Sequence, residues 1–387
     1  MDGRVGHFRT YYLPLTETFI YQYLTNHERY DPFVCAFLEQ NLEKFPFESR
    51  HVLQEEIRTN PSLAVDAFGH VAKLGYPYFE RVLDREDPDV VHAHFGPMGW
   101  HLQHVVEDRP LVTTFYGYDT SELVSPDTTL KERAKRLYTG DYRKKYRTLF
   151  AEGDRFLVEG PAMKEKLVNL GCPPRKIGIQ RIAIDVDRIK PSYPDSDPDW
   201  RVLMVGRFVD KKGMPDGIRA FARAFGDEPD AELRIVGGDA REVKQEDLEA
   251  IAGAEGVREK VTFTGYLDYD EYVKEIHSCD LLLAPSRTGK SGDSEGGAPT
   301  VLLEAQAAGK PVVATTHADI PYVVEDGVSG KLAPERDVDG LVRKLNEFRS
   351  DPGVLAEFGE RGRTNMERRH DISVLAPQLE STYDTLL

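Results

Sequence analysis

The sequence is poor in cysteine and has no long apolar run, and these absences narrow the classes of protein to consider. Its three cysteines, Cys35, Cys172 and Cys279, are far apart and odd in number, so they offer neither a disulfide framework nor a paired metal motif. No segment approaches the roughly 20 apolar residues that a membrane-spanning helix needs. A basic segment followed by an apolar stretch, the mark of a secretory signal, is also missing near Met1. We therefore expect a cytoplasmic protein with reduced thiols.

Positive charge is also in short supply, and the deficit is uneven. The formal net charge is −16; residues 1–190 carry 26 Lys and Arg against 28 Asp and Glu, whereas residues 191–387 carry 24 against 38. An acidic second half does not suit a nucleic-acid partner, whose phosphates demand cationic contacts. The contrast favours two domains in a chain of 387 residues.

Short apolar or β-branched runs alternate with helical patterns. In the first half we expect strands at Val5–Phe8, Pro32–Phe37, Val90–His94, Leu111–Phe115, Arg155–Val158 and Ile177–Arg181, with helical patterns at Phe19–Leu24, Phe68–Asp84 and Met163–Leu170. In the second half we expect strands at Val202–Val205, Glu232–Val236, Val261–Phe263, Leu281–Ala284 and Pro311–Ala314, with helices at Asp216–Phe225, Asp270–His277 and Val301–Ala308. Apolar strands separated by helices indicate parallel sheets covered on both faces.

The alternating pattern runs twice, so the sequence predicts an α/β protein with two Rossmann-like domains. The Pro- and Asp-rich stretch Pro191–Asp199 reads as the linker. We expect an N-terminal domain over residues 1–190, a C-terminal domain over 191–370, and a helix over 371–387 that returns to the first domain. The stretch Val338–Leu387 reads as helical throughout.

Two cations follow the first strand of the second half. The strand ends in Gly206, Arg207 comes next, and Lys212 follows five positions later. Ligands of parallel α/β sheets lie beyond the carboxyl ends of the strands. Two cations there suit a diphosphate and can stabilise the charge that grows on a leaving phosphate. From spacing alone, a charged surface loop is an equal alternative.

A glycine-rich loop runs directly into a helix in the same half. Glu295, Gly296 and Gly297 precede Pro299, a residue typical of a first helical turn. Free backbone N–H groups at such a terminus bind phosphate. Glu304 lies in the otherwise apolar segment Val301–Ala308, so its carboxylate needs a polar partner.

These two blocks resemble the retaining glycosyltransferases of GT-B family 4, which combine GRxxxxKG with an EGxxx…E motif. The segments Val91–Gly96, Val112–Asp119 and Leu15–Ile20 resemble the branch that builds exopolysaccharides such as colanic acid and amylovoran. The resemblance implies two Rossmann-like domains facing each other across a cleft. It also implies a nucleotide diphosphate sugar as donor substrate, a saccharide or lipid-linked acceptor, retention of configuration, and neither metal nor cofactor.

The resemblance also implies a role for each motif residue. The catalytic group would be Arg207, Lys212 and Glu295. Residues binding the donor would be Gly206, Tyr266, Leu267, Gly296, Gly297, Ala298, Pro299, Thr300, Val301 and Glu304, with Glu304 on the ribose and Tyr266 and Leu267 near the base. Residues on the acceptor side would be Thr16, Glu17, His94, Tyr116 and Asp119.

The sequence departs from the family pattern at two places. Tyr116 stands where the family usually has a histidine beside the donor sugar, so either its hydroxyl substitutes or the donor preference differs. Eight residues separate Glu295 from Glu304, where the family usually has seven. Either the loop bulges to accommodate the extra residue, or Glu295 does not have the role that the first glutamate of the motif has in the family.

Several other interpretations compete with a metal-free transferase. Ala284–Ser291 nearly matches a P-loop. An NTPase requires a helix directly after the Lys-Ser pair, but the residues after Lys290 and Ser291 do not favour one. Nucleotide-sugar 2-epimerases share the architecture but lack the paired motifs. Asp-x-Asp pairs such as Asp268/Asp270 could bind a divalent cation, but none of them lies in a glycine-rich setting. His92 and His94 could bind zinc, but the sequence offers no third ligand at suitable spacing.

The segment Lys131–Phe150 carries eight Lys and Arg against two acids, with aromatic residues between them. Such a pattern suits either an anionic membrane surface or a solvated helical face. It raises the hypothesis of a peripheral contact with the inner face of the membrane.

Overall fold

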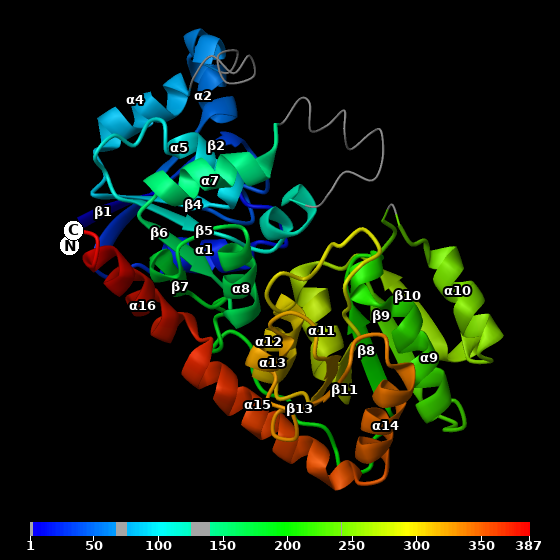
Figure 1. The fold of residues 1–387 in the computed structure, drawn as a ribbon. Helices are drawn as coiled ribbons and strands as arrows, with labels where there is room; N and C mark the ends of the chain where they lie inside the picture. Colours follow the sequence, from blue (N-terminus) through cyan, green and yellow to red (C-terminus); the bar gives the residue numbers. More distant parts are fainter. Residues whose placement is uncertain (1–2, 67–75, 125–139, 241) are drawn as a thin grey trace. The chain divides into compact units, whose positions relative to one another are not determined.

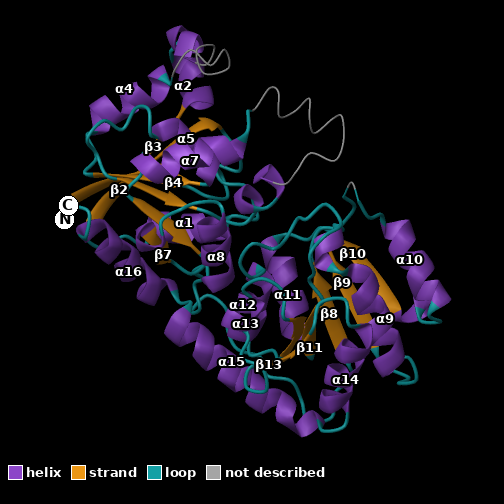
Figure 2. Ribbon diagram, viewed as in Figure 1, coloured by secondary structure: helices purple, strands orange, loops and turns teal. Residues whose placement is uncertain are grey.

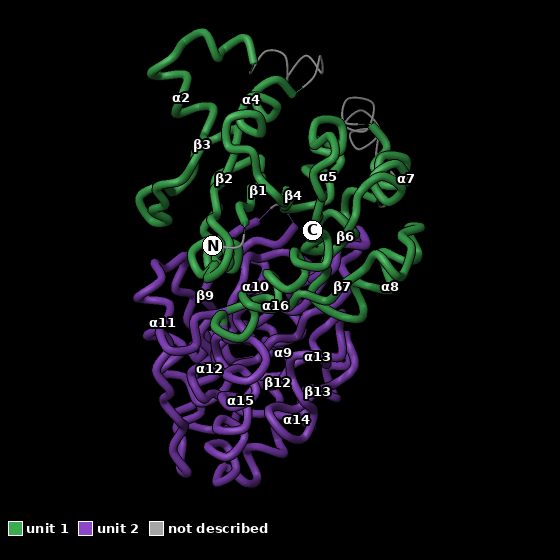
Figure 3. The backbone as a smooth tube through the Cα atoms, turned by 90° about the vertical axis from the view of Figure 1, so that its left-hand side faces the viewer, with its two compact units in different colours: residues 1–183, 372–387 green, residues 184–371 purple. Residues whose placement is uncertain are grey.

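The computed structural model describes residues 3–66, 76–124, 140–240 and 242–387 (Figure 1). The chain divides into two compact units, Met1–Ala183 with Ile372–Leu387, and Ile184–Asp371 (Figure 3). The boundaries lie near the expected 190/191 and 370/371. Residues 184–190 join the second unit because Arg363 of that unit donates to the carbonyls of Val186 and Ile189.

Unit 1 is built on a parallel sheet with helices on its faces (Figure 2). Among its described residues the strand order is β3-β2-β1-β4-β5-β6-β7. The strands are β1 (Gly3–Tyr11), β2 (Tyr30–Leu38), β3 (Arg50–Val52), β4 (Val90–His94), β5 (Leu111–Thr114), β6 (Arg155–Val158) and β7 (Ile177–Ile179). The helices are α1 (Thr18–Thr25), α2 (Leu53–Thr59), α4 (Pro77–Glu86), α5 (Gly96–Leu102), α7 (Tyr142–Glu152), α8 (Pro161–Asn169) and α16 (Ile372–Asp384).

Unit 2 repeats the same plan. Its described strands are also all parallel, in the order β10-β9-β8-β11-β12-β13. They are β8 (Arg201–Val205), β9 (Glu232–Val236), β10 (Val261–Gly265), β11 (Leu281–Ala284), β12 (Val312–Thr315) and β13 (Gly330–Ala333). The helices are α9 (Met214–Phe225), α10 (Gln245–Ala254), α11 (Tyr269–Ser278), α12 (Thr300–Ala307), α13 (Ile320–Val323), α14 (Val338–Arg349) and α15 (Leu355–Arg369).

The prediction of two parallel α/β units is confirmed, and every expected strand is present within a few residues. Two strands escaped prediction, β3 and β13, because three and four residues of mixed polarity carry little pattern. The prediction that Val338–Leu387 is helical throughout is wrong, since α14, α15 and α16 are separated by short breaks. The expected helix Phe68–Asp84 starts among residues 67–75, outside the described residues, and its last part lies in α4.

Helix α16 belongs to the core of unit 1 although it lies at the far end of the sequence. Its Leu375, Leu379 and Tyr383 are buried at a spacing of four and share a cluster with Val5 and Val90 of the central strands. The spacing of four places these side chains on one face of the helix. Among the described helices, none is both long and apolar enough to cross a membrane.

In each sheet the chain changes direction of travel once. It leaves β1 toward β2 and β3, then returns to lay β4 on the other side of β1. In unit 2 it likewise leaves β8 toward β9 and β10 before β11 pairs with β8. Loops at the carboxyl ends of such a strand pair diverge, which opens a crevice. The two crevices lie after β1 and β4, and after β8 and β11.

The hydrogen bonds of Arg363 stabilise the second unit, and a substitution of this residue tests their contribution. Its buried Nη1 donates to the carbonyls of Val186, Ile189 and Ala307 at 2.5–3.1 Å. Arg363→Leu leaves three acceptors without a donor and should lower the free energy of unfolding by about 2–4 kcal/mol. In a Trp100→Phe background, the fluorescence of Trp200 reports urea unfolding of unit 2.

The matched control is Arg361→Leu, two residues away on α15, where an exposed arginine pairs with Glu357. Its effect should stay within about 0.5 kcal/mol. Equal midpoint shifts for the two variants would contradict the assigned role of Arg363.

Candidate functional site

The candidate site of unit 2 begins where β8 ends. Gly206 has a φ of +153°, and a Cβ there would lie 3.1–3.2 Å from the aliphatic carbons of Lys212. The absence of a side chain therefore lets the stem of Lys212 lie across the end of the strand. Gly213 follows at a φ of +62°, where a Cβ would meet the Pro285 carbonyl oxygen at 1.9 Å. This close approach brings the loop after β8 against the loop after β11.

The ammonium of Lys212 is held by Glu295. Its Nζ lies 3.0 and 3.1 Å from the two carboxylate oxygens, and Ser286 Oγ donates to Oε1 at 2.7 Å. The Glu295 side chain is 6% exposed. Burial alone would raise the pKa of Glu295, but Lys212, Lys211 and the Ser286 hydroxyl together hold that pKa below its usual value. The carboxylate is therefore charged, and it fixes Lys212 at the carboxyl ends of β8 and β11.

The extra residue between Glu295 and Glu304 is accommodated by a bend. Gly296 has a φ of +83°, in the left-handed region that favours glycine. The chain bends over Gly296 and Gly297 before α12 begins at Thr300. Glu295 thereby points to Lys212 despite the longer spacing.

A second network of hydrogen bonds, centred on the buried His317, holds the same loop. His317 Nε2 lies 3.2 Å from the backbone nitrogen of Glu295 and from Ser294 Oγ. His317 Nδ1 lies 2.9 Å from Glu335, which also accepts from the backbone nitrogen of Thr288 at 2.6 Å. Because Nδ1 donates to the carboxylate, Nε2 carries no proton and accepts the N–H of Glu295.

A pocket opens between the two strand ends. It is lined by Met204, Val205, Lys212, Met214, Leu283, Ala284, Pro285, Ser286, Pro299 and Val301. Most of these residues are apolar, and the polar side chains among them are those of Lys212 and Ser286. The N-terminus of α12 closes one side. An anion entering here would meet a cation and the first backbone N–H groups of a helix.

Arg207 completes the charge of this region. Its side chain is exposed and forms no hydrogen bond or ion pair with any residue that the structure describes. Arg207 is thus available to a ligand, whereas Lys212 is already paired.

The predicted need of Glu304 for a polar partner is confirmed. Tyr272 OH of α11 donates to Glu304 Oε2 at 2.5 Å. Burial raises the pKa of Glu304 to about 7, and the Tyr272 hydroxyl lowers it only in part. Glu304 is 8% exposed, so it is a buried carboxyl, and among the described residues its Oε1 has no hydrogen-bond partner.

Tyr266 and Leu267 lie at the end of β10, beyond β9. The Tyr266 ring is 67% exposed, and it covers Gly238, where a Cβ would lie 2.7 Å from a ring carbon. An exposed aromatic ring pinned at a strand end is suited to stack on a planar base.

The segment that resembles a P-loop is a structural clamp. Arg287 pairs with Asp210 and Asp216, and the Lys290 backbone nitrogen donates to Asp210 Oδ2 at 2.7 Å. No helix follows Lys290 directly, since the chain runs irregularly to α12 at Thr300. The structure therefore gives no support to the NTPase interpretation.

In unit 1 the crevice after β1 and β4 holds Tyr116. Its ring lies between Phe19 and Phe95, with centroids 5.0 and 4.8 Å away. Its hydroxyl lies 2.7 Å from His94 Nδ1. Phe95 itself has a φ of +75°, an uncommon and strained value outside glycine. The Arg9 guanidinium lies 4.2 Å from the Phe95 ring centroid.

The remaining residues expected on the acceptor side differ in exposure. Asp119 is buried, and its carboxylate accepts from the backbone nitrogens of Gly96, Tyr116 and Gly117 at 2.9–3.1 Å. It shapes the loops after β4 and β5. Glu17 pairs with Arg9 and is half-buried, and Thr16 is exposed.

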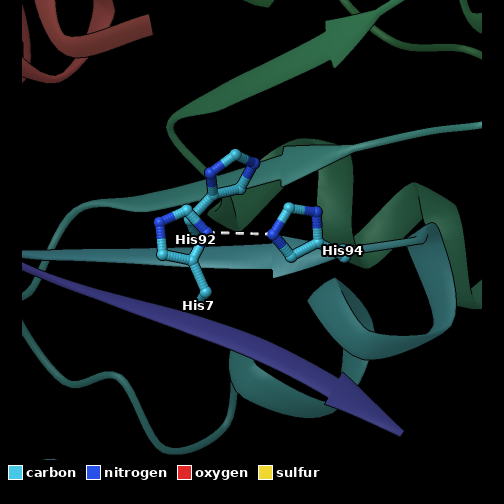
Figure 4. Close-up of side chains that lie close together, drawn as sticks. All are labelled: His7, His92 and His94. Atoms are coloured by element: carbon cyan, nitrogen blue, oxygen red, sulfur yellow. Dashed lines mark hydrogen bonds between the residues drawn. The ribbon is translucent and has the colours of Figure 1, made fainter. Parts of the chain in front are cut away.

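A histidine from another strand joins His92 and His94. His7 of β1 lies beside β4, and one nitrogen from each of the three rings lies within 4.8 Å of the others (Figure 4). The sequence did not suggest this third residue because 87 positions separate His7 from His94. Other contributors also escaped prediction: Ser286, Tyr272, His317 and Glu335 come from separate elements and form no motif. A Glu inside an apolar helix was the signal that a partner such as Tyr272 was needed.

Comparisons with known proteins give matches to two family models and to relatives of known name. The model of a family described as "Glycosyl transferases group 1" matches residues 185–365, and that of "Glycosyltransferase Family 4" matches residues 33–188. The putative colanic acid biosynthesis glycosyltransferase WcaL of Salmonella typhimurium is 30% identical over 304 residues, 77% of this chain and 71% of the relative. The amylovoran biosynthesis glycosyltransferase AmsK of Erwinia amylovora is 32% identical over 282 residues, 69% and 64%.

Among solved structures, Anabaena HepE in complex with UDP superposes with a TM-score of 0.74 at 17% identity, covering 99% of both chains. At this identity the likeness shows the fold, which is two Rossmann-like domains of the GT-B type.

Glu304 gives a test that needs no substrate. Its pKa in the folded chain, about 7, lies above its usual value of 4.5, so ionisation costs stability as pH rises between these two values. Glu304→Gln removes that cost, because Gln still accepts from Tyr272. The variant should gain about 2 kcal/mol more at pH 8 than at pH 5. Denaturation in urea at the two pH values measures this.

The control is Glu360→Gln, an exposed carboxylate on α15. It should show no such pH dependence. A gain for Glu304→Gln that is equal at both pH values would mean that the buried carboxyl keeps an ordinary pKa.

Proposed function

This chain belongs to the group 1 and family 4 glycosyltransferases, and we propose that it moves a sugar from a nucleotide diphosphate to a saccharide or lipid-linked acceptor, with retention of configuration and without a metal ion. Glycosyltransfer follows from its family. The stereochemistry, the metal independence and the residue roles are the parts proposed.

The observation that carries the proposal is the Lys212–Glu295 pair, whose lysine lines the pocket. The bond that breaks joins the sugar to the diphosphate, and negative charge grows on the leaving oxygen. Lys212, fixed by Glu295, and Arg207, which is exposed, would stabilise that charge. The first backbone N–H groups of α12 would bind phosphate oxygens. These donors do the work that a divalent cation does in metal-dependent transferases.

The rest of the donor fits around this point. Glu304 has an oxygen available for ribose hydroxyls, and the exposed ring of Tyr266 is available to the base. Glu295 lies beside Lys212, so its carboxylate would also face the transferred sugar. Retention requires the acceptor hydroxyl to attack from the face that the diphosphate leaves, and it is proposed from family membership.

Lys212 gives the direct test of this mechanism. A panel of UDP-, GDP- and ADP-sugars, read by thermal shift and then by turnover, identifies the donor, since a bound ligand raises the melting temperature. With that donor, Lys212→Ala should lower kcat by on the order of 10² or more, because a contact to the leaving group is lost. EDTA should leave the wild-type rate unchanged.

Lys290→Ala is the matched control, because it removes an exposed lysine from the neighbouring loop. Its turnover should be near wild type. Full activity of Lys212→Ala, or loss of activity in EDTA, overturns the mechanism. Survival of Lys212→Ala together with loss in Lys290→Ala would favour the NTPase alternative.

The proposal extends to a membrane-borne acceptor through the basic segment Lys131–Phe150. Residues 131–139 lie outside the described residues, and residues 142–150 belong to α7. Tyr146 and Phe150 of α7 are buried in the core. Arg143 donates to the Val124 carbonyl at 2.7 Å, and Lys144 is exposed. Tyr146 and Phe150 therefore serve packing, and the attraction to a membrane that we propose for α7 is electrostatic.

This attraction predicts binding to vesicles that depends on salt. The protein should co-sediment with anionic liposomes at low salt and be released as salt passes about 0.15 M, where charges are screened beyond about 8 Å. Replacing Arg143, Lys144 and Lys145 with Glu should abolish sedimentation and leave nucleotide binding unchanged.

The charge-matched control carries Glu at Lys44, Lys164 and Arg175, elsewhere on unit 1. It should still sediment. If wild type fails to sediment at low salt, or both triple variants lose binding equally, the acceptor is better sought among soluble saccharides.

A further inference from the structure

The buried histidines of unit 1 are joined end to end. His94 Nε2 lies 2.9 Å from His7 Nδ1 (Figure 4), and His7 Nε2 lies 3.0 Å from His27 Nε2. His27 Nδ1 lies 3.3 Å from Glu380 Oε1 on α16. At the other end, His94 Nδ1 lies 2.7 Å from the Tyr116 hydroxyl. A continuous hydrogen-bonded chain therefore runs from the C-terminal helix to the crevice after β1 and β4.

The direction of this chain is set at Glu380. Its Oε1 accepts from the backbone nitrogens of Glu28 and Arg29 at 2.8 and 2.9 Å, and its side chain is 1% exposed. Burial alone would raise the pKa of Glu380, but these backbone donors hold it below the usual value. The carboxylate is thus charged and can only accept, so His27 must carry its proton on Nδ1.

The charge of Glu380 then determines which ring nitrogen carries the proton in each histidine of the chain. Burial lowers the pKa of His27, His7 and His94, so each ring is neutral and carries one N–H. With its proton on Nδ1, His27 accepts at Nε2, and His7 must donate from its own Nε2. His7 then accepts at Nδ1, and His94 donates from Nε2. His94 Nδ1 is left as an acceptor, and the Tyr116 hydroxyl must donate to it.

We propose that Glu380, His27 and His7 act through His94 as positioning residues for Tyr116. They make the Tyr116 hydroxyl donate its proton to His94 Nδ1, so that the hydroxyl oxygen accepts a hydrogen bond from a substrate hydroxyl. The ring of Tyr116 is held between Phe19 and Phe95, so only the hydroxyl proton remained to be oriented. Tyr116 is partly exposed, whereas His7 and His94 are buried. This functional part rests on the proposed transfer reaction; the proton order does not.

A metal ion is the competing explanation of the same cluster. The rings of His92 and His94 are stacked, with centroids 4.5 Å apart and planes 26° apart. Because the lone pairs of imidazole lie in the ring plane, stacked rings do not aim nitrogens at one point. Both nitrogens of His92 also have partners, Tyr383 OH and Thr114 Oγ1, each at 2.7 Å. The hydrogen bonds therefore account for the cluster without an ion.

Selective ¹⁵N-histidine NMR of the full-length protein reads the proton order directly. Resonances are assigned by single substitutions. We expect His27 to carry its proton on Nδ1, and His7 and His94 to carry theirs on Nε2. The opposite tautomer at any of the three overturns the inference. So does about one equivalent of tightly bound zinc in the purified protein that is lost in His94→Ala.

The functional arm uses the donor found in the panel above. His7→Phe should leave His94 without its single tautomer and lower kcat/KM about five- to tenfold, the value of one hydrogen bond. Tyr116→Phe should cost about the same. The double variant should cost no more than either alone, because both remove one arrangement.

Tyr23→Phe is the control, since it removes a buried hydroxyl bonded to Gln180 and Arg181 in the same core but outside the chain. It should keep the tautomers and the activity. Additive losses for His7 and Tyr116, or an equal loss in Tyr23→Phe, refute the positioning role. If wild type turns over no donor, the proposed reaction fails while the tautomers still test the chain.

Discussion

Parallel strand pairing is the constraint on which the rest of this protein depends. Because all strands of each described sheet run the same way, every loop that follows a strand reaches the same edge. The order of the strands then makes β8 adjacent to β11, and β1 adjacent to β4, although long stretches of chain separate them. This adjacency brings Lys212 near Glu295, and His7 near His94. The pocket of unit 2 and the histidine chain of unit 1 therefore both lie where the first strand of the unit pairs with its fourth.

Both sites solve the same electrostatic problem in different ways. A buried carboxylate is costly unless a cation or several donors surround it. Glu295 is paired with Lys212, so it remains charged and keeps the cation in place for an anionic ligand. Glu304 has a single tyrosine donor, and burial raises its pKa to about 7. Glu380 receives backbone N–H groups and stays charged, which orders the protons of a chain that ends at Tyr116.

The motifs that could be read from the sequence are those whose residues are close together along the chain. Gly206, Arg207 and Lys212 follow one strand, and Glu295 and Glu304 flank one helix start, so their places along these elements could be predicted from the sequence. Their partners have no such signal. Ser286 and Tyr272 come from other elements, and the tertiary fold brings them within hydrogen-bonding distance. The near match to a P-loop was already set aside on the sequence, and in the structure Arg287 of that segment pairs with Asp210 and Asp216.

The sequence by itself determined the fold class, the position of most strands along the chain and the motifs that follow the strands, because hydrophobic period and short motifs are local properties. The tertiary structure decided which charges neutralise one another and where the protons lie. Lys212 is paired while Arg207 remains exposed, and Glu380 of the last helix orients a tyrosine of the fifth strand's loop. These outcomes depend on distances of about 3 Å between residues far apart in the chain, and hydrogen bonds and ion pairs act only at such distances.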